Sequence, residues 1–466
     1  MPHNLGLKRG VVELVDHDPS WERIASETIA KLKEIFGDNA TDIQHVGSTA
    51  IRGIKAKPVI DIAVAVTNFD DVMALTPVLE KQGFICVSWE SNGEIHPMYQ
   101  CGEFVSGEKL PRLLTHFIHI VMADSQQWHD YINHRDYMNA CPIAAHEYES
   151  LKLRLAAENS DNYHNYFLGK QEHIHETVKI ARLWNDFRRE FTQIMPINKG
   201  WSEDKKYCVK TADGVKYLLR ITPISRYESR KSLFEVLQRV AALGIPMCEP
   251  VEFGTCEDGV YSLQSWIDGE DLEAAMPMLT DTEQYVLGLK SGEILLKMHS
   301  ILVPETQEEW EIRFNKKIDR NIALNKNCVD EGLVIDGLEY LHDFVQSNRH
   351  LLKNRPQCFQ HGDYHVGNMM LENGELKIID FDRYDFGDPW EEFNRMTFNA
   401  MASPHFATGL LRGYFNGEPP HEFFELQAFY IASTHLGGLS WAREFGESEI
   451  IFTKNKFPIF SVGSTT

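Results

Sequence analysis

The sequence predicts a two-domain protein that joins an α/β domain to an α+β domain. Its 466 residues suggest about two to four domains of the usual size. Residues 1–183 show alternating helix and strand patterns, whereas from Met195 onward a β-hairpin leads into a long, mostly helical stretch. The hydrophobic content of 43% and the charged content of 24% are typical of globular proteins, so both domains can bury a core.

Net charge limits the classes of binding partner, and cysteine content indicates the cellular compartment. The net charge is −22, and a strongly acidic chain repels nucleic-acid backbones and attracts small cations. The eight cysteines are scattered and form no C-x-x-C pair, which indicates a reducing compartment. No signal-peptide pattern or membrane-length apolar run is present. We therefore expect a cytoplasmic protein that binds no nucleic acid and no membrane; its oligomeric state is left open.

The first domain is predicted to span residues 1–183. One apolar face predicts a helix from Ser20 to Phe36, which Gly37 ends, and a β-rich run predicts a strand from Val59 to Val66. Further predicted elements are a helix at 70–82, strands at 84–89 and 115–121, and helices over 126–183 with breaks near Pro142 and Asp161.

The second domain is predicted to span residues 197–466, after a helical connection at 184–196. The segments KYCVK and KYLLRIT flank the turn TADG and predict a hairpin. A helix is expected at about 227–243 and a strand at 260–267. The polar run at 452–466 lacks the amphipathic pattern of a closing helix.

Residues 358–383, CFQHGDYHVGNMMLENGELKIIDFDR, carry the strongest chemical signal. Four residues separate Asp363 from Asn368, and Asp380 follows twelve positions later, after a hairpin and at the end of a predicted strand. Phosphoryl transfer needs one carboxylate to position and deprotonate the attacking hydroxyl group. It also needs an amide oxygen and a second carboxylate to hold Mg²⁺. The spacing therefore predicts a phosphotransferase.

The motif H-G-D-x-H-x-G-N with the downstream IDFDR resembles the aminoglycoside phosphotransferase family, over about residues 195–450. The resemblance implies a bilobal, protein-kinase-like fold. It also implies that Asp363 is the catalytic base and that Asn368 and Asp380 are the Mg²⁺ ligands. Asp382 then either assists at the metal or faces the substrate.

Other polar residues of this region are interpreted as structural. We expect His361 and His365 to fix the catalytic loop through hydrogen bonds, and Asp388 to anchor the fold.

The same resemblance implies a nucleotide site for ATP or GTP in the first lobe. Arg220, on the predicted strand KYLLRIT, takes the place of a phosphate-binding lysine, and Glu235 on the next helix is its expected partner. Gly200 lies in the turn expected to cover the phosphates. Ser265, Trp266 and Ile267 are expected at the hinge that meets the base.

The phosphate acceptor is less defined. We expect a small hydroxylated molecule, and leave open whether it is cationic: an aminoglycoside-like antibiotic, a sugar or an amino alcohol. Two alternatives stay open: a ligand-sensing protein whose kinase domain does not turn over, and a bifunctional nucleotidyltransferase and kinase. Acidic residues that could bind an amine, or simply lie in solvent, are Asp268, Glu270, Asp271, Glu273, Glu391, Glu392, Glu444, Glu447 and Glu449.

The run HVGSTAIRGIKAKPVIDIAV, together with THFIHIV and YESLK, resembles the GrpB family over about residues 10–183. The resemblance implies a nucleotidyltransferase-like fold. Gly47 and Ser48 fit the turn of that fold and Asp61 fits its first metal-binding carboxylate, but Ala63 stands at the second position. Two-metal catalysis needs oxygen ligands from both carboxylate positions. We therefore expect the domain to bind a ligand without nucleotidyl transfer.

The expected ligand of the first domain carries phosphate, and its pocket is expected to include Gly47, Ser48, Asp61 and His119. His116 and His119 are three apart on a predicted strand and so point to opposite faces. His45 could line this pocket together with Asp61 and His119, or be buried for structural reasons. Three lysines could contact the phosphate or lie in solvent: Lys57, Lys152 and Lys170.

Overall fold

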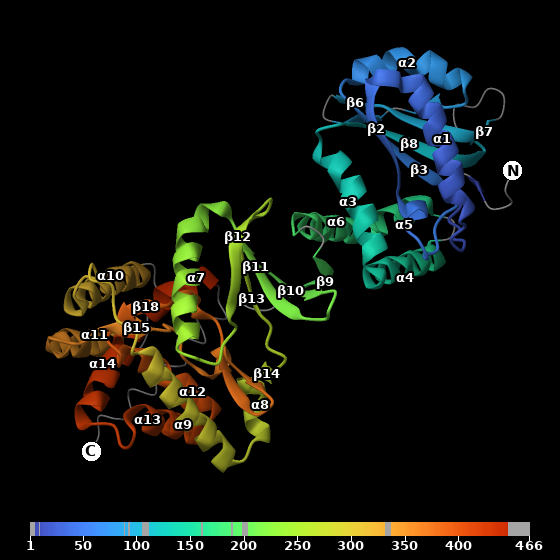
Figure 1. Cartoon of the computed structure of the whole chain (residues 1–466). Coiled ribbons are helices and arrows are strands. Elements are labelled where there is room, and N and C mark those ends of the chain that lie inside the picture. Colours follow the sequence, from blue (N-terminus) through green and yellow to red (C-terminus); the bar gives the residue numbers. More distant parts are fainter. Residues whose placement is uncertain are drawn as a thin grey trace. The chain divides into compact units, whose positions relative to one another are not determined.

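The computed structural model describes residues 5–8, 10–87, 89–91, 94–104, 111–159, 162–187, 190–197, 204–330 and 337–445. Gly200 and residues 446–466, with the polar end of the chain, lie outside these ranges. The chain divides into two compact units, residues 1–216 with 255–259, and residues 217–254 with 260–466. Within the described part of the chain, no helix is both long and apolar enough to cross a membrane. The mixture of α/β and α+β structure is confirmed (Figure 1).

The predicted helices of the first unit and its strands near 59–66, 84–89 and 115–121 are observed in that order. Its helices are α1 Ser20–Phe36, α2 Phe69–Lys81, α3 Gln126–Ala140, α4 Pro142–Glu158, α5 Tyr163–Gly169 and α6 Gln171–Asp186. Its strands are β1 Leu7–Lys8, β2 Ala40–Val46, β3 Ile60–Val66, β4 Ile85–Cys86, β5 Trp89–Ser91, β6 Glu94–His96, β7 Met98–Glu103, β8 Leu113–Met122, β9 Phe191–Pro196 and β10 Lys205–Thr211. Strands β1, β2, β6 and β7 were not predicted.

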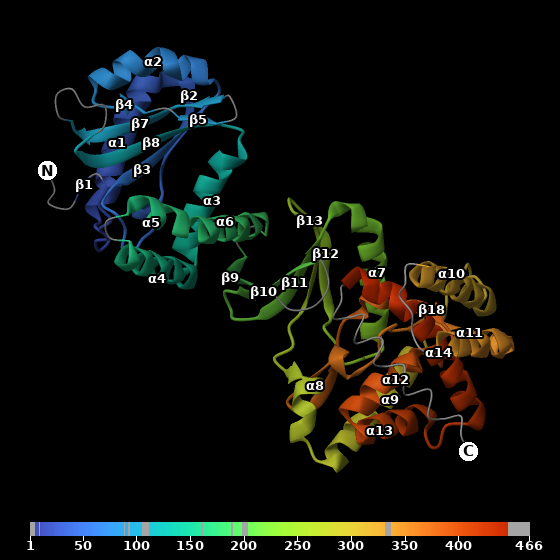
Figure 2. The same ribbon diagram turned by 180° about the vertical axis from the view of Figure 1, so that it is seen from behind.

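A mixed sheet in the order β2-β3-β8-β7-β4 forms the centre of this unit, with β1 paired to β8. Strands β3 and β8 run parallel, and the neighbouring pairs are antiparallel. Alternate residues of β3 face the helices α1 and α2, and their core includes Trp21, Phe36 and Ile62. The opposite face of β3 carries Asp61 and Ala63, and helix α3 packs on that side (Figure 2).

The predicted helical connection at 184–196 is wrong for its second half. Helix α6 ends at Asp186, and residues 191–196 form strand β9, which pairs antiparallel with β10. Phe191 and Ile194 are both buried and are spaced three apart, a spacing that suggests a helix. Pairing with β10 satisfies the backbone groups of this segment instead, so the local pattern is overridden.

The second unit contains the long helical stretch and several short strands. Its strands are β11 Lys216–Thr222, β12 Pro250–Cys256, β13 Gly259–Ser265, β14 Glu270–Asp271, β15 Cys358–Gln360, β16 Met369–Glu372, β17 Glu375–Ile378 and β18 Asp385–Gly387. Its helices are α7 Tyr227–Ala242, α8 Leu272–Ala275, α9 Asp281–Met298, α10 Trp310–Asp330, α11 Leu338–Ser347, α12 Met396–Ala402, α13 Pro404–Phe415 and α14 His421–Phe445.

Two small sheets position the motif found in the sequence. Strands β14, β16 and β17 are neighbours in that order, and β15 pairs with β18. The predicted hairpin turn ENGE connects β16 to β17. The catalytic loop runs between β15 and β16, and it ends in the short helical turn η6 Val366–Asn368.

Helices α9 and α13 pack backbone against backbone, because glycines line their contact. A Cβ atom added at Gly288 would lie 2.2 Å from the carbonyl oxygen of Phe406, and one added at Gly413 would lie 2.1 Å from that of Leu289. Real side chains do not fit at such distances, so only glycine permits this approach. The helix pair belongs to the main hydrophobic core of the second unit.

Candidate active site

The three residues predicted to carry phosphotransfer are tied together through the backbone. The side-chain nitrogen of Asn368 donates a hydrogen bond to the carbonyl oxygen of Asp363 at 2.9 Å. The backbone N–H of Ile379 donates to the carbonyl oxygen of Asn368 at 3.0 Å. Because Asp380 follows Ile379 directly, the catalytic loop and the end of β17 are fixed to each other. The structure therefore brings Asp363, Asn368 and Asp380 into one site.

Asp380 stands just past the end of a strand, in an unusual backbone conformation. Strand β17 ends at Ile378, two residues before the acid rather than at it. Asp380 has φ 64° and ψ 65°, the left-handed region that short polar side chains enter more readily than others. Its carboxylate is exposed. The amide nitrogen of Asn368 is already used, so its side-chain oxygen and the Asp380 carboxylate are the groups that fit Mg²⁺, which prefers oxygen ligands.

Two arginines and a histidine surround the carboxylate of Asp363. Arg395 Nε lies 2.9 Å from Oδ1, His365 Nε2 lies 3.7 Å from Oδ1, and Arg383 Nη1 lies 3.8 Å from Oδ2. Burial acts to raise the pKa of Asp363, but the bond to His365 and the charges of Arg395 and Arg383 outweigh it. The pKa is therefore held well below its usual range, and the carboxylate is ionised at neutral pH.

A buried glutamate holds the start of the catalytic loop. The carboxylate of Glu392 accepts hydrogen bonds from the backbone N–H groups of His361, at 2.6 Å, and Gly362, at 2.9 Å. The ring of His361 is fully buried, and its Nε2 bonds the carbonyl oxygen of Ile379 at 3.0 Å. His361 thus has the structural role expected for it, because it links the loop to the segment that carries Asp380.

Asp388 anchors the fold through several partners. Its carboxylate is fully buried and accepts from the guanidinium group of Arg355, the hydroxyl group of Tyr430 and the backbone N–H of Trp390. Tyr430 belongs to α14, so this cluster fixes the last described helix to the strand pair β15 and β18.

Two acids that had been candidates for amine binding are structural instead. Glu391 and Glu392 are buried; Glu391 accepts from Gln360 and Lys317. Both carboxylates are used inside the domain, as buried charges require. The side chain of Glu444 and the residues Glu447 and Glu449 lie outside the described part of the structure.

Arg220 forms an ion pair with an acid of the IDFDR segment. Its guanidinium group donates to Asp382 Oδ2, and Arg230 of α7 donates to Oδ1 of the same carboxylate at 2.8 Å. Burial acts to raise the pKa of Asp382, but the two arginines outweigh it and lower the pKa. Glu235 lies exposed on α7, so its pairing with Arg220 stays a prediction.

The expected nucleotide hinge runs between β13 and β14. Ser265 accepts a hydrogen bond from the backbone N–H of Glu249 at 2.8 Å, and Trp266 donates to Asp268 at 3.1 Å. Ile267 is buried. The segment is therefore fixed in place, and its contact with a nucleotide base stays a prediction.

In the first unit the structure brings Asp61, Gly47 and His119 together. His119 Nε2 lies 3.1 Å from Asp61 Oδ1, across the parallel strands β3 and β8. Gly47 has φ 69°, and a Cβ atom there would lie 2.5 Å from Asp61 Oδ2. Glycine is thus required both by the backbone and by the acid beside it. Ser48 follows and begins the short turn η2 Ser48–Ala50.

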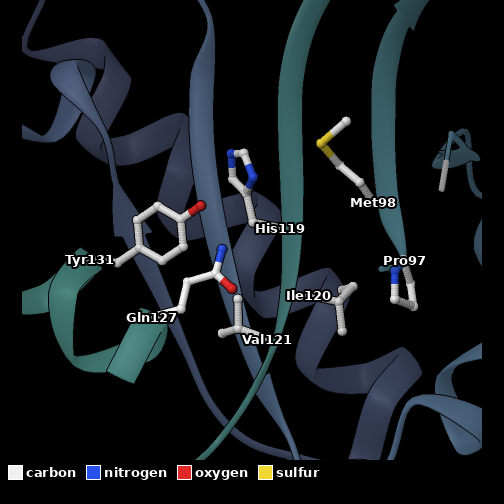
Figure 3. A pocket seen from close by; sticks show the side chains of 7 residues that line it. All are labelled: Pro97, Met98, His119, Ile120, Val121, Gln127 and Tyr131. Atoms are coloured by element: carbon white, nitrogen blue, oxygen red, sulfur yellow. The ribbon is translucent and has the colours of Figure 1, made fainter. Parts of the chain in front are cut away.

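His119 also lines a small cavity of about 60 Å³. Figure 3 shows the ring of Tyr131, from α3, beside that of His119, and their centroids are 5.5 Å apart. The other lining residues are Pro97, Met98, Ile120, Val121 and Gln127. A cavity of this size holds only a few water molecules.

Two other histidines of the first unit, His116 and His45, face elsewhere. His116 is buried and its Nε2 lies 3.3 Å from the hydroxyl oxygen of Thr28 on α1, so it faces away from His119 as predicted. His45 pairs with Ile62 in the sheet and its Nε2 lies 3.0 Å from the hydroxyl oxygen of Thr49. Burial lowers the pKa of His45 to about 4. His45 therefore lies on the sheet face away from Asp61 and does not line the pocket with Asp61 and His119.

The sequence did not reveal the roles of three residues that complete the second-unit site: Arg395, Arg230 and Glu392. Arg395 lies 32 positions after Asp363, on the turn η8 Glu391–Arg395, and no motif spacing links the two. A buried acid such as Glu392 also looks, in a sequence, like any charge on a helical surface.

Comparisons with known proteins match two separate stretches of the chain, and the second stretch begins before the first unit ends at Lys216. Residues 11–179 match the family model "GrpB protein", and residues 193–424 match the model "Phosphotransferase enzyme family". The chain is 36% identical to the glutamate-rich protein GrpB of Alkalihalophilus pseudofirmus over 175 residues, which are 37% of this chain and 98% of that protein.

Solved structures are also similar to each part. The GrpB protein of Enterococcus faecalis is 27% identical, with a TM-score of 0.33, over 36% of this chain and 96% of that chain. A ternary complex of streptomycin, ATP and APH(2″)-IIa is 16% identical, with a TM-score of 0.45, over 60% of this chain and 94% of that chain. The chain belongs to the GrpB family through its first domain, to which a domain of the phosphotransferase enzyme family is fused.

Proposed function

We propose that the second domain transfers the γ-phosphoryl group of ATP or GTP to a hydroxyl group of a small molecule. The observation that carries this proposal is the hydrogen-bonded linkage of Asp363, Asn368 and Asp380, within a domain of the phosphotransferase enzyme family. In this linkage the base and both metal-binding groups keep a fixed spacing, and phosphoryl transfer depends mainly on such positioning.

Asp363 orients the acceptor hydroxyl group in this proposal. Because its pKa is held low, its carboxylate is a weak base, so it takes the proton late, as the oxygen bonds to phosphorus. Arg395 keeps the carboxylate in place through the ion pair at 2.9 Å. Asn368 and Asp380 would hold Mg²⁺, which neutralises charge on the transferred phosphoryl group.

Arg220 is proposed to bind the nucleotide phosphates. Its guanidinium group forms an ion pair with Asp382 in the structure. A bound triphosphate would therefore either share the guanidinium group with Asp382 or replace Asp382 as its partner. Arginine can bind phosphate through two parallel hydrogen bonds, which suits this exchange.

A cationic acceptor is supported by one carboxylate beside the catalytic loop. Glu273 lies in the first turn of α8, and its Oε2 lies 3.6 Å from the position of a Cβ atom built on Gly367. The exposed Asp268 and Glu270 precede it on the same segment. We therefore propose a hydroxylated amine, such as an aminoglycoside-like compound or an amino alcohol, ahead of an uncharged sugar.

The test uses the full-length protein with Mg-ATP or Mg-GTP and a panel of aminoglycosides, sugars and amino alcohols. Release of ADP or GDP that depends on the acceptor is the expected result. Asp363→Asn should still bind nucleotide, while kcat falls by roughly 10²–10⁴, the usual contribution of a positioned acid–base group. Turnover near the wild-type rate in that variant would show that Asp363 is not the base.

Two other outcomes identify the alternatives. Nucleotide binding without turnover across the whole panel would favour a ligand-sensing protein. Release of pyrophosphate that disappears in Asp61→Ala would favour nucleotidyl transfer by the first domain.

A further inference from the structure

Three lysines of the first domain converge on a group of tyrosine rings. Lys57 Nζ lies 4.4 Å from the ring centroid of Tyr163 and 5.5 Å from that of Tyr166. Lys170 Nζ also lies 5.5 Å from the Tyr166 centroid. The lysines come from three segments: Lys57 precedes β3, Lys152 lies in α4, and Lys170 lies between α5 and α6.

Lys152 is the most deeply buried of the three. Its side chain is 1% exposed, and Nζ donates a hydrogen bond to the carbonyl oxygen of Lys55 at 2.6 Å. It also lies 4.6 Å from the ring centroid of Tyr148. A carbonyl group and an aromatic face attract a cation, but they do not balance its charge.

The nearest carboxylates are engaged with other groups. Glu149 accepts from the backbone N–H of Lys55 at 2.6 Å, and Asp61 pairs with His119. Among the described residues, no salt bridge joins Lys57, Lys152 or Lys170 to any carboxylate. Burying charged ammonium groups without a counter-ion is costly. The described residues supply these lysines with no carboxylate partner, so a bound anion would lower that cost.

The pKa values agree with this interpretation. Burial, followed by repulsion from Lys170, lowers the pKa of Lys152 to about 7. Burial, followed by repulsion from Lys57, lowers the pKa of Lys170 to about 8. The pKa of Lys57 is also lowered by burial, although the charge of Asp61 acts against this shift.

We propose that Lys57, Lys152 and Lys170 form a binding site for a small anion that carries two or more phosphate groups. Three ammonium groups near one another call for a polyvalent partner, because a single carboxylate would leave two of them unbalanced. Lysine provides point charges that adapt to phosphate oxygens. The chain as a whole has a net charge of −22, so a cluster of one buried and two half-buried lysines is a local feature that needs its own explanation.

This site extends the pocket expected at Gly47, Ser48, Asp61 and His119, and it depends on none of the kinase chemistry. The three lysines add cations to a domain in which Ala63 stands at the position of the second metal-binding carboxylate. The ligand is therefore bound and not transferred in this proposal. Phosphate groups of a nucleotide and free pyrophosphate share the same chemistry, and the test separates them.

The first test titrates the full-length protein with pyrophosphate in the absence of Mg²⁺, by calorimetry. Separate titrations use ATP, sulfate and acetate. The lysine site predicts that pyrophosphate binds more tightly than sulfate and that acetate does not bind measurably. If ATP competes with pyrophosphate for these lysines, the phosphates of a nucleotide are the source of the ligand; if ATP leaves them free, the site takes free pyrophosphate.

The matched variants are Lys152→Met and Arg154→Met, which remove the same charge from the same helix. Lys152 is buried and Arg154 is exposed. We expect Lys152→Met to lower the affinity for pyrophosphate at least 10-fold and Arg154→Met to change it less than 2-fold. Equal effects of the two variants would overturn the proposal, because a general charge effect would then explain binding.

A residue-specific measurement covers the case in which Lys152→Met does not fold. Lysines with a low pKa react with acylating reagents at neutral pH, since the neutral amine is the nucleophile. Pyrophosphate should protect Lys57, Lys152 and Lys170 of the wild-type protein from acylation, as measured by mass spectrometry of peptides. Exposed Lys31 serves as the internal control and should be unaffected. Absence of protection at saturating pyrophosphate would refute the site.

The pH dependence gives an independent readout. A bound anion favours the charged lysines, so binding takes up protons and the affinity for sulfate, which does not itself titrate, should fall between about pH 7 and pH 9. The charged and titratable groups that face the three lysines are Asp61, His134, Tyr148, Glu149, Tyr163 and Tyr166. Sulfate affinity that is constant across this range would contradict the proposal.

Discussion

Replacement of Glu392 by alanine should destabilise the second domain and displace its catalytic loop. The carboxylate is 2% exposed and accepts two backbone hydrogen bonds, from His361 at 2.6 Å and from Gly362 at 2.9 Å. The variant leaves one buried and one half-buried N–H group without an acceptor, in the segment that leads directly to Asp363.

The magnitude follows from those two bonds. Hydrogen bonds to a charged group contribute about 1.5–3 kcal/mol each, and water that enters the cavity recovers part of this. We therefore expect the free energy of unfolding to fall by about 3 kcal/mol. For a domain of roughly 150–250 residues, this corresponds to a decrease in Tm of about 6–12 °C. The control is Glu375→Gln, which removes an exposed partner of Lys290 and should cost less than about 0.5 kcal/mol.

Hydrogen exchange of individual amides is the sharpest assay, alongside thermal unfolding of the second domain. The amides of His361 and Gly362 should exchange faster in Glu392→Ala, by about 10-fold or more, while amides of α9 change only through the general loss of stability. The value of kcat should fall more than the KM for nucleotide rises. If the two amides keep their protection in a folded variant, the carboxylate does not hold the loop and the reasoning fails.

Four further outcomes are expected. Asp380→Ala should abolish both turnover and the effect of Mg²⁺ on nucleotide binding, and an unchanged Mg²⁺ titration would exclude it as a ligand. Arg220→Ala should weaken nucleotide binding, with partial recovery in Arg220→Lys because a point charge still reaches phosphate; equal affinities in all three proteins would rule out that role. Gly47→Ala should lower the stability of the first domain by at least about 1–2 kcal/mol, measured by thermal unfolding, since its φ of 69° is unfavourable for alanine. For Lys152, whose pKa is about 7 when folded and 10.5 when unfolded, the unfolded state binds more protons between these values, so the wild-type free energy of unfolding should rise from pH 7 to pH 9 more than that of Lys152→Met.

Much of the fold could be predicted because local patterns and tertiary structure agree. The helix at Ser20–Phe36 was predicted with its observed bounds, since an apolar face and a terminal glycine both mark it. Strand β9 was not predicted, because the segment becomes a strand only by pairing with β10, and a pairing between segments is not visible in either one alone.

The candidate site likewise contains residues that the sequence predicts and residues that only the folded structure reveals. Asp363, Asn368 and Asp380 could be predicted from spacing, because one loop and one hairpin determine their separation. Arg395 could not, since it reaches Asp363 only through the packing of η8 against the loop. The lysines of the first domain were visible as residues, but their burial and their lack of carboxylate partners depend on three segments coming together.

The glycine-lined contact of α9 and α13 affects how the sequence of this protein can vary. Gly288, Gly292, Gly409 and Gly413 take no part in the proposed chemistry, yet any larger residue would force the two helices apart. In a saturation mutagenesis experiment these four positions should be as intolerant as catalytic ones, whatever substrate is used for selection. Their intolerance would report the requirement for close helix packing, and it should persist in variants selected for a different acceptor.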